Sequence, residues 1–314
     1  MSKICIFILL FIVTSGNVFA QEDDGILWEI TGNDAKKSYI LGTCHAVEGD
    51  FLDSIPGFAT AWFHAEKIMT ECEVNRSLLT KIENSGENAT EMPSDTTYAM
   101  LLDSADLAKL DSLFHGVFST ISKLKPIVIT PFVKQMMNGT SKSVSTKKSQ
   151  SRAYMDAEIQ LRCRENGKIS AYCETHEVQL NLNRFTRNIM INIPLDQQAK
   201  MLHNVLINNN TVNSNKNNQD DLVRKYKAGS IRFVNMDELL TDTEGIMLSP
   251  DIVQKIYDMT FTNRNNRWMP IIEKHINEAP TLIAVGFGHL IGANGLIAQL
   301  RKQGYIVNPI TKEE

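Results

Sequence analysis

The sequence predicts a mixed α/β (α+β) fold, in which strands and helices alternate along the chain. Three observations support this class. Hydrophobic residues make up 43% of the 314 residues and charged residues 22%, a composition typical of a folded globular protein. Short apolar runs suited to strands alternate with longer segments of helical periodicity. Two of the predicted strands end in the same pattern, Gly-x-x-His, near opposite ends of the chain.

In the first half of the chain, apolar runs and prolines predict the elements. Two short strands surround a polar turn, and a helix then leads into an apolar run that ends in an acid. A helical region in two pieces follows, and Pro126 and Pro131 bracket a break before the next helix. The predicted strands cover 25–30, 38–42 and 67–71, and the predicted helices cover 55–66, 97–124 and 131–137.

In the second half, caps help to place the helices. Gly167 ends one helix, and Ser249 with Pro250 forms a typical helix start. The polar segments 138–153 and 208–220 are predicted to be loops. The predicted strands cover 169–173, 281–285 and 305–310, and the predicted helices cover 154–166, 176–206, 250–260, 264–278 and 292–303.

Residues 1–20 have the features of a secretory signal peptide. Lys3 precedes the apolar run Ile4–Val13, and Val18 and Ala20 fit the small-residue pattern of a cleavage site. The run is shorter than the roughly 20 residues that a membrane span needs, so cleavage is favoured over an uncleaved anchor. We therefore expect export to the periplasm or the extracellular space, one folded domain over 21–314, and no stable membrane span after cleavage.

Charge and missing motifs exclude several classes of protein. The formal net charge is −4 at pH 7, so no basic surplus exists to bind a phosphate backbone, and nucleic acid is not an expected partner. The chain contains no G-x-S-x-G and no H-E-x-x-H, which excludes a serine hydrolase elbow and a zincin. The glycines of 286–292 are spaced like a dinucleotide loop, but the acid expected about 20 residues later is missing.

Four cysteines follow residue 20, and export would permit disulfides between them. Neighbouring strand residues point to opposite faces, so a site formed by His45 and Glu71 would leave Cys44 and Cys72 together on the other side. A Cys44–Cys72 bridge is therefore one expectation, and two free buried thiols are the alternative. The other natural pair is Cys163 with Cys173.

The chemistry is predicted at three strand ends. The strand 38–42 runs into Gly42-Thr-Cys-His45, and the strand 281–285 runs into Gly286-Phe-Gly-His289. The strand 67–71 ends at Glu71. Open α/β sheets bind ligands at the carboxyl ends of their strands. Two imidazoles and a carboxylate meeting there could bind a divalent metal with an open position, or could act as a metal-free acid/base set.

Motifs along nearly the whole chain resemble those of the TraB/GumN family, a group that also includes the Tiki proteases. The last of these motifs, around His289, is the most specific. The residues that carry the resemblance are Leu27–Ile30, Tyr39–His45, Ala65–Glu71, Met155–Asp156, Gly167–Lys168, Glu174–Thr175, Tyr226–Gly229, Arg264–Asn265 and Val285–Leu296.

The resemblance implies two mixed sheets flanked by helices and related by an internal pseudo-repeat, each half carrying one strand and Gly-x-x-His. It also implies a metal-dependent, peptidase-like hydrolase domain over 21–314. Its site would consist of His45, Glu71 and His289, with Arg264 as a polar supporting residue. The metal would be a divalent ion held by the first three, with Mn, Co and Zn not distinguished. Cys44 stands where the family usually has an aliphatic residue.

Several candidate residues keep a structural alternative. A buried Glu71 could form an ion pair with Arg264 instead of serving a reaction, and Arg264 could stabilise an oxyanion or form only a salt bridge. Glu174 is a candidate for either the site or fold support, since Ala171–Cys173 replaces the family's usual residues before it. Glu73 is a fallback ligand, His176 is a weaker candidate, and Asp156 is expected to cap a helix.

Two functions follow from these residues. The first is a secreted or periplasmic hydrolase, a metal-dependent peptidase acting on a peptide or protein substrate. Here His45 and His289 hold the metal or the attacking water, Glu71 serves as base or third ligand, and Arg264 stabilises the oxyanion. The second is a non-catalytic peptide-binding or regulatory protein on the same fold. The sequence makes no prediction about the oligomeric state.

Overall fold

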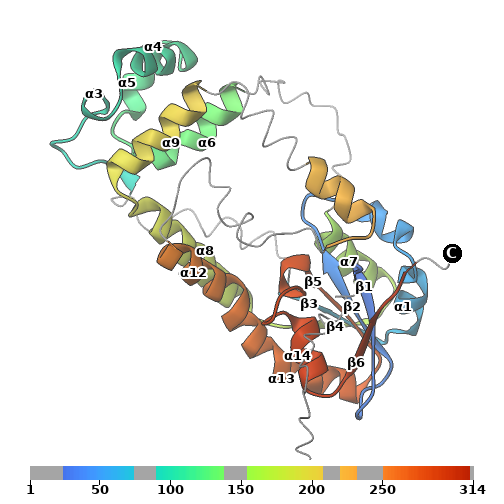
Figure 1. Ribbon diagram of the computed structural model, residues 1–314. Helices are drawn as coiled ribbons and strands as arrows, with labels where there is room; N and C mark the ends of the chain where they lie inside the picture. Colours follow the sequence, from blue (N-terminus) through green and yellow to red (C-terminus); the bar gives the residue numbers. More distant parts are fainter. Residues whose placement is uncertain (1–23, 74–89, 138–153, 208–219, 232–249, 312–314) are drawn as a thin grey trace, which may run out of the picture.

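A computed structural model of the chain describes residues 24–73, 90–137, 154–207, 220–231 and 250–311. Their strands form one six-stranded sheet in the order β4-β3-β5-β2-β1-β6 (Figure 1). The neighbouring strands β4, β3, β5 and β2 run parallel, and β1 is antiparallel to both β2 and β6. The strands are β1 (Leu27–Thr31), β2 (Ser38–Thr43), β3 (Lys67–Thr70), β4 (Ile169–Tyr172), β5 (Thr281–Gly286) and β6 (Ile306–Pro309).

Helices cover both faces of this sheet (Figure 1). The connections β2-α1-β3 and β3-α7-β4 both lead toward the β4 edge of the sheet, whereas the connection from β4 through α13 to β5 leads back toward its centre. Because such crossovers are right-handed, α1 and α7 lie on one face of the sheet and α13 and α14 lie on the other. One apolar core fills both layers, with Leu41, Ile283 and Trp268 fully buried. The elements are η1 (Gly49–Ser54), α1 (Phe58–His64), α7 (Met155–Glu165), α13 (Asn263–Glu278), η5 (Phe287–His289) and α14 (Leu296–Lys302).

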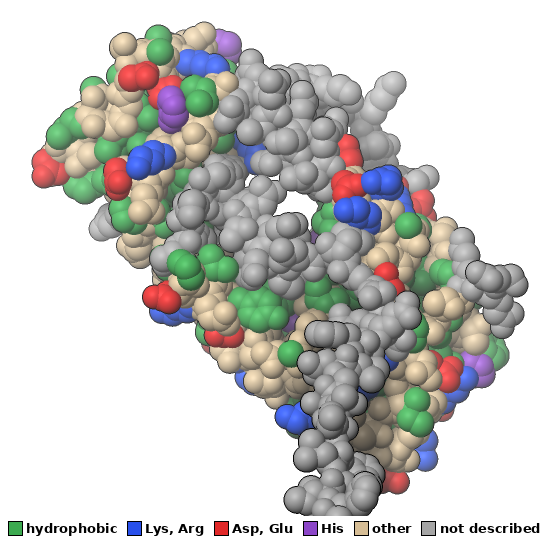
Figure 2. Space-filling view, viewed as in Figure 1, with side chains coloured by type: hydrophobic (Ala, Val, Ile, Leu, Met, Phe, Trp, Pro, Cys, Tyr) green, Lys and Arg blue, Asp and Glu red, His purple; other side chains and the backbone are tan. Residues whose placement is uncertain are grey.

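A separate group of helices has its own apolar core and lies away from the sheet (Figure 1). Leu110, Val133 and Leu202 are fully buried in it. Figure 2 shows acidic, basic and apolar side chains interspersed over the described part of the face it presents. The group consists of α3 (Tyr98–Leu101), α4 (Ser104–Leu113), α5 (Phe118–Ile121), α6 (Pro126–Met137) and α9 (Leu195–Ile207).

Two long helices join this group to the sheet. The helix α8 (His176–Ile191) leaves the end of β4, and α12 (Pro250–Tyr257) returns toward α13 beside it (Figure 1). Ile189 and Met190 near the end of α8 pack in one cluster with Ile252 and Val253 near the start of α12. The two helices are therefore antiparallel.

Most of the predicted elements are confirmed, and the differences have local causes. The helix predicted from 131 begins at Pro126, because proline is tolerated in a first turn, and Pro131 lies inside it. The helical stretch 176–206 is divided into α8 and α9 before Leu195, at Pro194. The last helix begins at Leu296 rather than 292, after the turn that contains Gly292 and Gly295.

Other expectations concern the whole arrangement. The described residues form one mixed sheet, so the predicted second sheet is not found among them. The internal pseudo-repeat stays a prediction. Residues 1–20, the loop 138–153 and most of 208–220 lie outside the described residues. No helix in the described ranges is long and apolar enough to cross a membrane.

The predicted disulfides are not formed. Cys44, Cys72, Cys163 and Cys173 are all free and buried, which is the alternative considered for the first two. The thiol of Cys72 donates to Oε1 of Gln179 instead of approaching Cys44. Burial raises the pKa of Cys72 to about 11, so this thiol is protonated at neutral pH and is a poor nucleophile.

Candidate active site

The three predicted strand ends meet at one edge of the sheet. β5 lies between β3 and β2, and all three strands run parallel. Glu71 directly follows β3, His45 lies two residues beyond β2, and His289 lies in the turn η5 after β5. The side chains that the sequence assigned to a common site therefore follow three neighbouring strands at their carboxyl ends.

Glu71 is held by two donors from different elements. Its Oε1 accepts the backbone N–H of Gly286 at 2.8 Å, and its Oε2 accepts Nη2 of Arg264 at 2.6 Å. The side chain is 13% exposed, so it remains partly open to solvent. Nε2 of His289 lies 3.7 Å from Oε1, which makes the imidazole a neighbour of the same carboxylate.

Arg264 is the centre of this network, and all five of its N–H groups have acceptors. Nη2 donates to Glu71 and to Oε1 of Glu174, the latter at 2.7 Å, and Nε donates to Oε2 of Glu174 at 3.3 Å. Nη1 donates to the carbonyl of Thr260 at 3.3 Å and to Nε2 of His289 at 3.0 Å. No donor remains for a substrate oxyanion, so this arrangement favours the ion-pair alternative for Arg264.

Asn265, the neighbour of Arg264, fixes the tautomer of His289. The amide Nδ2 of Asn265 donates to the carbonyls of His289 and Asn294, at 3.1 and 2.9 Å. The amide oxygen Oδ1 therefore faces Nδ1 of His289, at 2.7 Å. Because that oxygen can only accept, Nδ1 carries the proton, and Nε2 accepts from Arg264.

The protonation states of the buried groups follow from their surroundings. Burial alone would raise the pKa of Glu71, but His289, Arg264 and the Gly286 amide outweigh it and lower this pKa to about 2. Burial lowers the pKa of His289 to about 3, and the charge of Arg264 adds to this against the pull of Glu71. At neutral pH the site therefore holds an ionised carboxylate beside a neutral imidazole.

His45 is oriented by Asp156 at the start of α7. Nδ1 of His45 lies 2.8 Å from Oδ2 of Asp156, and the hydroxyl of Thr43 donates to Oδ1 of the same carboxylate at 2.7 Å. The hydrogen bond to Asp156 raises the pKa of His45 to about 9. Its side chain is 77% exposed. His45 is thus a protonated, solvent-facing imidazole, and Glu71 and Arg264 lie close enough to act on its charge.

A π-turn covers the buried imidazole. The segment η4 (Asp258–Thr262) joins α12 to α13 with the wider π-helical hydrogen bonding. It places the ring of Phe261 5.1 Å from that of His289 and supplies the Thr260 carbonyl to Arg264. Trp268 packs on the other side, 4.3 Å from the imidazole between ring centres. Such turns are frequent at functional sites.

The predicted metal ligands are not arranged as a three-ligand centre. Nε2 of His289 and Oε2 of Glu71 both accept from Arg264, and His45 pairs with Asp156. Among the described residues, the group of three potential ligands whose atoms lie within 4.8 Å of one another is Asp103, Asp106 and His203. That group lies in the separate helical part, and its contacts are a helix cap and an Asp106–His203 hydrogen bond.

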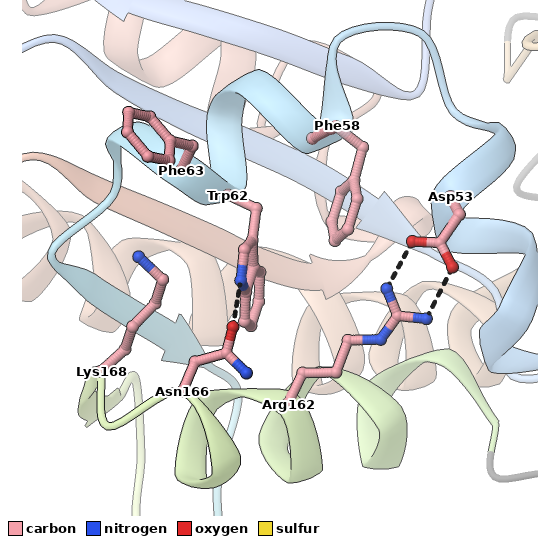
Figure 3. A pocket seen from close by; sticks show the side chains of 8 residues that line it. Asp53, Phe58, Trp62, Phe63, Arg162, Asn166 and Lys168 are labelled. Carbon is pink, nitrogen blue, oxygen red and sulfur yellow. Dashed lines mark hydrogen bonds and ion pairs between the residues drawn. The ribbon is translucent and has the colours of Figure 1, made fainter.

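A pocket of about 500 Å³ lies elsewhere, between α1, η1 and α7. Figure 3 shows Phe58 and Trp62 pointing from α1 toward α7, where Arg162 forms two contacts with Asp53. Trp62 donates its indole N–H to Asn166. Asn166 lies ten residues beyond Asp156, roughly 15 Å along the helix. None of the predicted site residues lines this pocket, so we do not assign the reaction to it.

Three partner residues of the site carry only a weak signal in the sequence. Asp156 was expected to cap a helix, yet it orients His45. Asn265 was part of a motif without a role, and it orients His289. Glu174, left open between site and fold support, holds Arg264 and accepts the indole N–H of Trp268 at 3.1 Å. Glu73 is exposed, two residues beyond Glu71.

Comparison with known proteins places the chain in a family. The model of the TraB/PrgY/gumN family matches residues 26–309. The chain belongs to the TraB/PrgY/gumN family. The matched range contains all six strands of the sheet and every residue of the site described above. No curated protein and no solved structure matches the chain significantly.

Membership of the TraB/PrgY/gumN family agrees with the resemblance inferred from the motifs. Both Gly-x-x-His segments, Glu71 and the Arg264–Asn265 pair lie in the matched range and at one sheet edge in the fold. In this TraB/PrgY/gumN chain Glu71, Arg264, Asn265 and His289 therefore form a single contact network, although they are far apart in the sequence. His45 pairs with Asp156 beside it.

Proposed function

We propose that this protein is a hydrolase that cleaves peptide bonds at the edge formed by His45, Glu71 and His289. One observation carries the proposal: each Gly-x-x-His histidine has its Nδ1 held by an oxygen acceptor. These acceptors are Asp156 and Asn265, and they determine which nitrogen of each ring remains for other partners. Imidazoles oriented in this way are typical of catalytic and metal-ligating histidines.

The residues divide the acid and base roles between them. Water held by the Glu71 carboxylate attacks the carbonyl carbon and passes its proton to that carboxylate, while the leaving amine takes a proton from His45. The raised pKa of His45 supports the acid role, because the ring is protonated at neutral pH. Arg264 and the Gly286 amide keep Glu71 ionised and fixed in position.

A divalent ion at His45, Glu71 and His289 does not fit the side chains as they lie. Arg264 would have to leave Nε2 of His289 and Oε2 of Glu71, and His45 would have to join them. We therefore assign no step to a metal. A requirement for Mn, Co or Zn would be revealed by loss of turnover in a chelator and its return with that ion.

A screen against a peptide library tests the proposal, with matched pairs of variants. Glu71→Gln is expected to lower kcat/KM at least about 100-fold, whereas Glu73→Gln, an exposed acid two residues away, should leave it unchanged. His45→Ala should behave like Glu71→Gln, and His64→Ala, on an exposed site of α1, like wild type. Turnover that survives in Glu71→Gln would contradict the assignment.

The second candidate is a peptide-binding protein without turnover. The full use of the Arg264 donors favours it, since a hydrolase gains from a free donor at the oxyanion. Tight binding of library peptides with no cleavage by wild type would support this candidate. We also propose that the protein acts outside the cytoplasm, and the N-terminal sequence of the protein purified from its native host would test cleavage near residue 20.

A further inference from the structure

The pocket of about 500 Å³ between α1, η1 and α7 lies apart from the candidate active site. Its volume falls in the range of natural small-molecule sites. Lys168, which lines it, directly precedes β4, so this part of the pocket lies at the amino end of a strand whose carboxyl end leads to Glu174. A ligand bound here would therefore meet a different set of groups from those around Glu71.

One wall of this pocket is aromatic and comes from α1. Phe58 and Trp62 lie one helical turn apart, with 5.8 Å between their ring centres, and both point toward α7 (Figure 3). Phe63 also lines the pocket, and its side chain is 82% exposed, which leaves a large apolar surface open. Walls of this kind favour a ligand with an apolar and preferably aromatic body.

Asn166 presents hydrogen-bond donors on the side of α7. The indole N–H of Trp62 donates to Oδ1 of Asn166 at 3.2 Å (Figure 3). Because an indole nitrogen can only donate, this contact identifies which end of the amide is the oxygen. Both hydrogens on Nδ2 of Asn166 then remain without an acceptor in the described part of the chain, and the residue is exposed. They are free to donate to a ligand.

Lys168 adds a positive charge to the same end of the pocket. Its ammonium donates to the backbone carbonyl that follows α1 and lies 5.8 Å from the centre of the Trp62 ring. An ammonium has three donors, so two are left. Within the described ranges no carboxylate pairs with Lys168, whereas the other cation of the pocket, Arg162, pairs with Asp53 and Glu158.

The end of α7 offers few acceptors to balance these donors. Its carbonyls at 162, 163 and 164 already accept backbone N–H groups from 166, 168 and 167, in the pattern of a helix cap closed by Gly167 at φ +65°. The free groups beside Trp62 are therefore donors, and one of them is charged. A ligand has to supply acceptors in return, and a carboxylate supplies them with the matching charge.

We propose that this pocket binds a carboxylate carried on an aromatic body. The ring packs against the aromatic side chains of α1, and the carboxylate accepts from Nζ of Lys168 and Nδ2 of Asn166. A small aromatic acid and the C-terminal aromatic residue of a peptide share this chemistry. The inference goes beyond the proposed function and does not depend on it, because no residue of the pocket belongs to the candidate active site.

The experiment titrates the full-length protein with N-acetyl-phenylalanine. Trp62 is the partly exposed one of the three tryptophans, since Trp28 and Trp268 are buried, so a ring entering the pocket should change the tryptophan fluorescence. At the ligand efficiency usual for small molecules, about 15 non-hydrogen atoms give a Kd of about 0.5 mM. The neutral amide of the same compound and N-acetylglycine, which has no ring, should each bind at least about tenfold more weakly.

Two variants test the donors, and a third serves as their control. Lys168→Met removes the charge, and Asn166→Asp keeps an acceptor for the indole N–H while it replaces the donor by a negative charge. Each should raise Kd about tenfold. Lys227→Met is the matched control, because Lys227 also lies over an aromatic ring, that of Phe51 at 5.5 Å, but does not line the pocket. Tm is measured on each variant to show that it folds.

The outcomes decide the inference and the source of the ligand. Equal affinity for the acid and its amide, or for N-acetylglycine, overturns the proposal, and so does a Kd that is unchanged in both Lys168→Met and Asn166→Asp. The absence of saturable binding up to about 10 mM, roughly twenty times the expected Kd, overturns it as well. A peptide arm uses acetyl-glycyl-glycyl-phenylalanine in a Glu71→Gln background that prevents cleavage. Tighter binding of this peptide than of N-acetyl-phenylalanine supports a peptide C-terminus as the ligand, and weaker binding supports a small acid.

Discussion

At the scale of single residues, the site depends on the protonation state of each imidazole, which the acceptor at its Nδ1 helps to set. Asp156 and Asn265 both face an Nδ1 atom, but one is a charged acceptor at an exposed ring and the other a neutral acceptor at a buried ring. The same Gly-x-x-His motif therefore produces two imidazoles that differ in charge at neutral pH. His45 has a raised pKa of about 9 and His289 a lowered pKa of about 3. Pairs of groups whose pKa values are driven apart are a common basis for acid/base roles.

The first prediction tests the partner of His45. Replacing Asp156 by Asn removes the charged acceptor, so the pKa of His45 should fall from about 9 toward its ordinary value near 6.5. An NMR titration of the His45 ring protons measures this directly. Glu158→Gln is the control, because Glu158 lies two residues further along α7 and pairs with Arg162 instead. An unchanged titration in Asp156→Asn would mean that another group holds the proton.

The second prediction concerns Asn265. Its side chain makes three hydrogen bonds inside the core, to the ring and carbonyl of His289 and to the carbonyl of Asn294. Asn265→Ala leaves these groups unsatisfied and should lower the free energy of unfolding by about 3 kcal/mol, as measured by urea denaturation. The exposed neighbour Asn266, replaced in the same way, should cost little, since its oxygen only accepts from Gln299. Equal costs for the two variants would show that the buried network adds no stability.

At the scale of elements, the first glycines of the two Gly-x-x-His motifs serve different contacts. A Cβ on Gly42 would lie 2.9 Å from side-chain atoms of Leu290 and Phe287 and 3.0 Å from the Phe287 backbone, so β2 and the turn η5 require a glycine to approach so closely. A Cβ on Gly286 would meet only the Glu71 carboxylate oxygen, at 3.3 Å, and the His289 ring. The end of a flexible side chain can move, whereas backbone cannot.

The third prediction follows from that difference. Gly42→Ala should lower the free energy of unfolding by about 1–3 kcal/mol, the usual cost of overpacking a core. Gly286→Ala should cost less, but should disturb Glu71 and therefore the proposed turnover. Denaturant unfolding together with the peptide assay would separate the two effects. A larger stability loss in Gly286→Ala than in Gly42→Ala would show that the turn η5 moves away from an added methyl group more easily than the Glu71 carboxylate does.

Helices and strands with a local sequence signal could be predicted, whereas the contacts between side chains far apart in the sequence could not. Apolar runs, prolines and glycines indicated all six strands and placed Glu71, His45 and His289 at strand ends. The π-turn at 258–262 could not be expected, because its residues continue the pattern of the helix before it. The pairing of Asp156 with His45 joins residues more than a hundred positions apart, and an acid at a helix start is more simply explained as a cap.

For the whole molecule, the site is a product of the complete sheet. Arg264 reaches it from α13, Glu174 from the end of β4, and Asp156 from α7, so these groups meet only when the parallel strands are paired. The ionisation of the site is consequently linked to global folding. Any group whose pKa differs between the folded and unfolded chain makes stability depend on pH.

The directions of the three pKa shifts predict a pH at which the protein is most stable. Glu71 has a folded pKa of about 2, below its ordinary value of 4.5, so its contribution is present above pH 4.5 and is lost toward pH 2. His289 has a folded pKa of about 3, below 6.5, so its contribution is lost as the pH falls below 6.5. His45 has a folded pKa of about 9, above 6.5, so its contribution is complete below 6.5 and is lost as the pH rises to 9.

The fourth prediction is therefore that, as far as these three groups decide it, the free energy of unfolding is greatest near pH 6.5 and falls on both sides. The alkaline limb should be the shallower one, because His45 is largely exposed and solvent screens its pair with Asp156. Urea denaturation between pH 3 and pH 9 measures the profile. Asp156→Asn should flatten the alkaline limb and keep the acid limb, whereas Glu158→Gln should keep both. An alkaline limb that is unchanged in Asp156→Asn would show that the His45–Asp156 pair adds nothing to folding, and the acid role proposed for His45 would lose its electrostatic support.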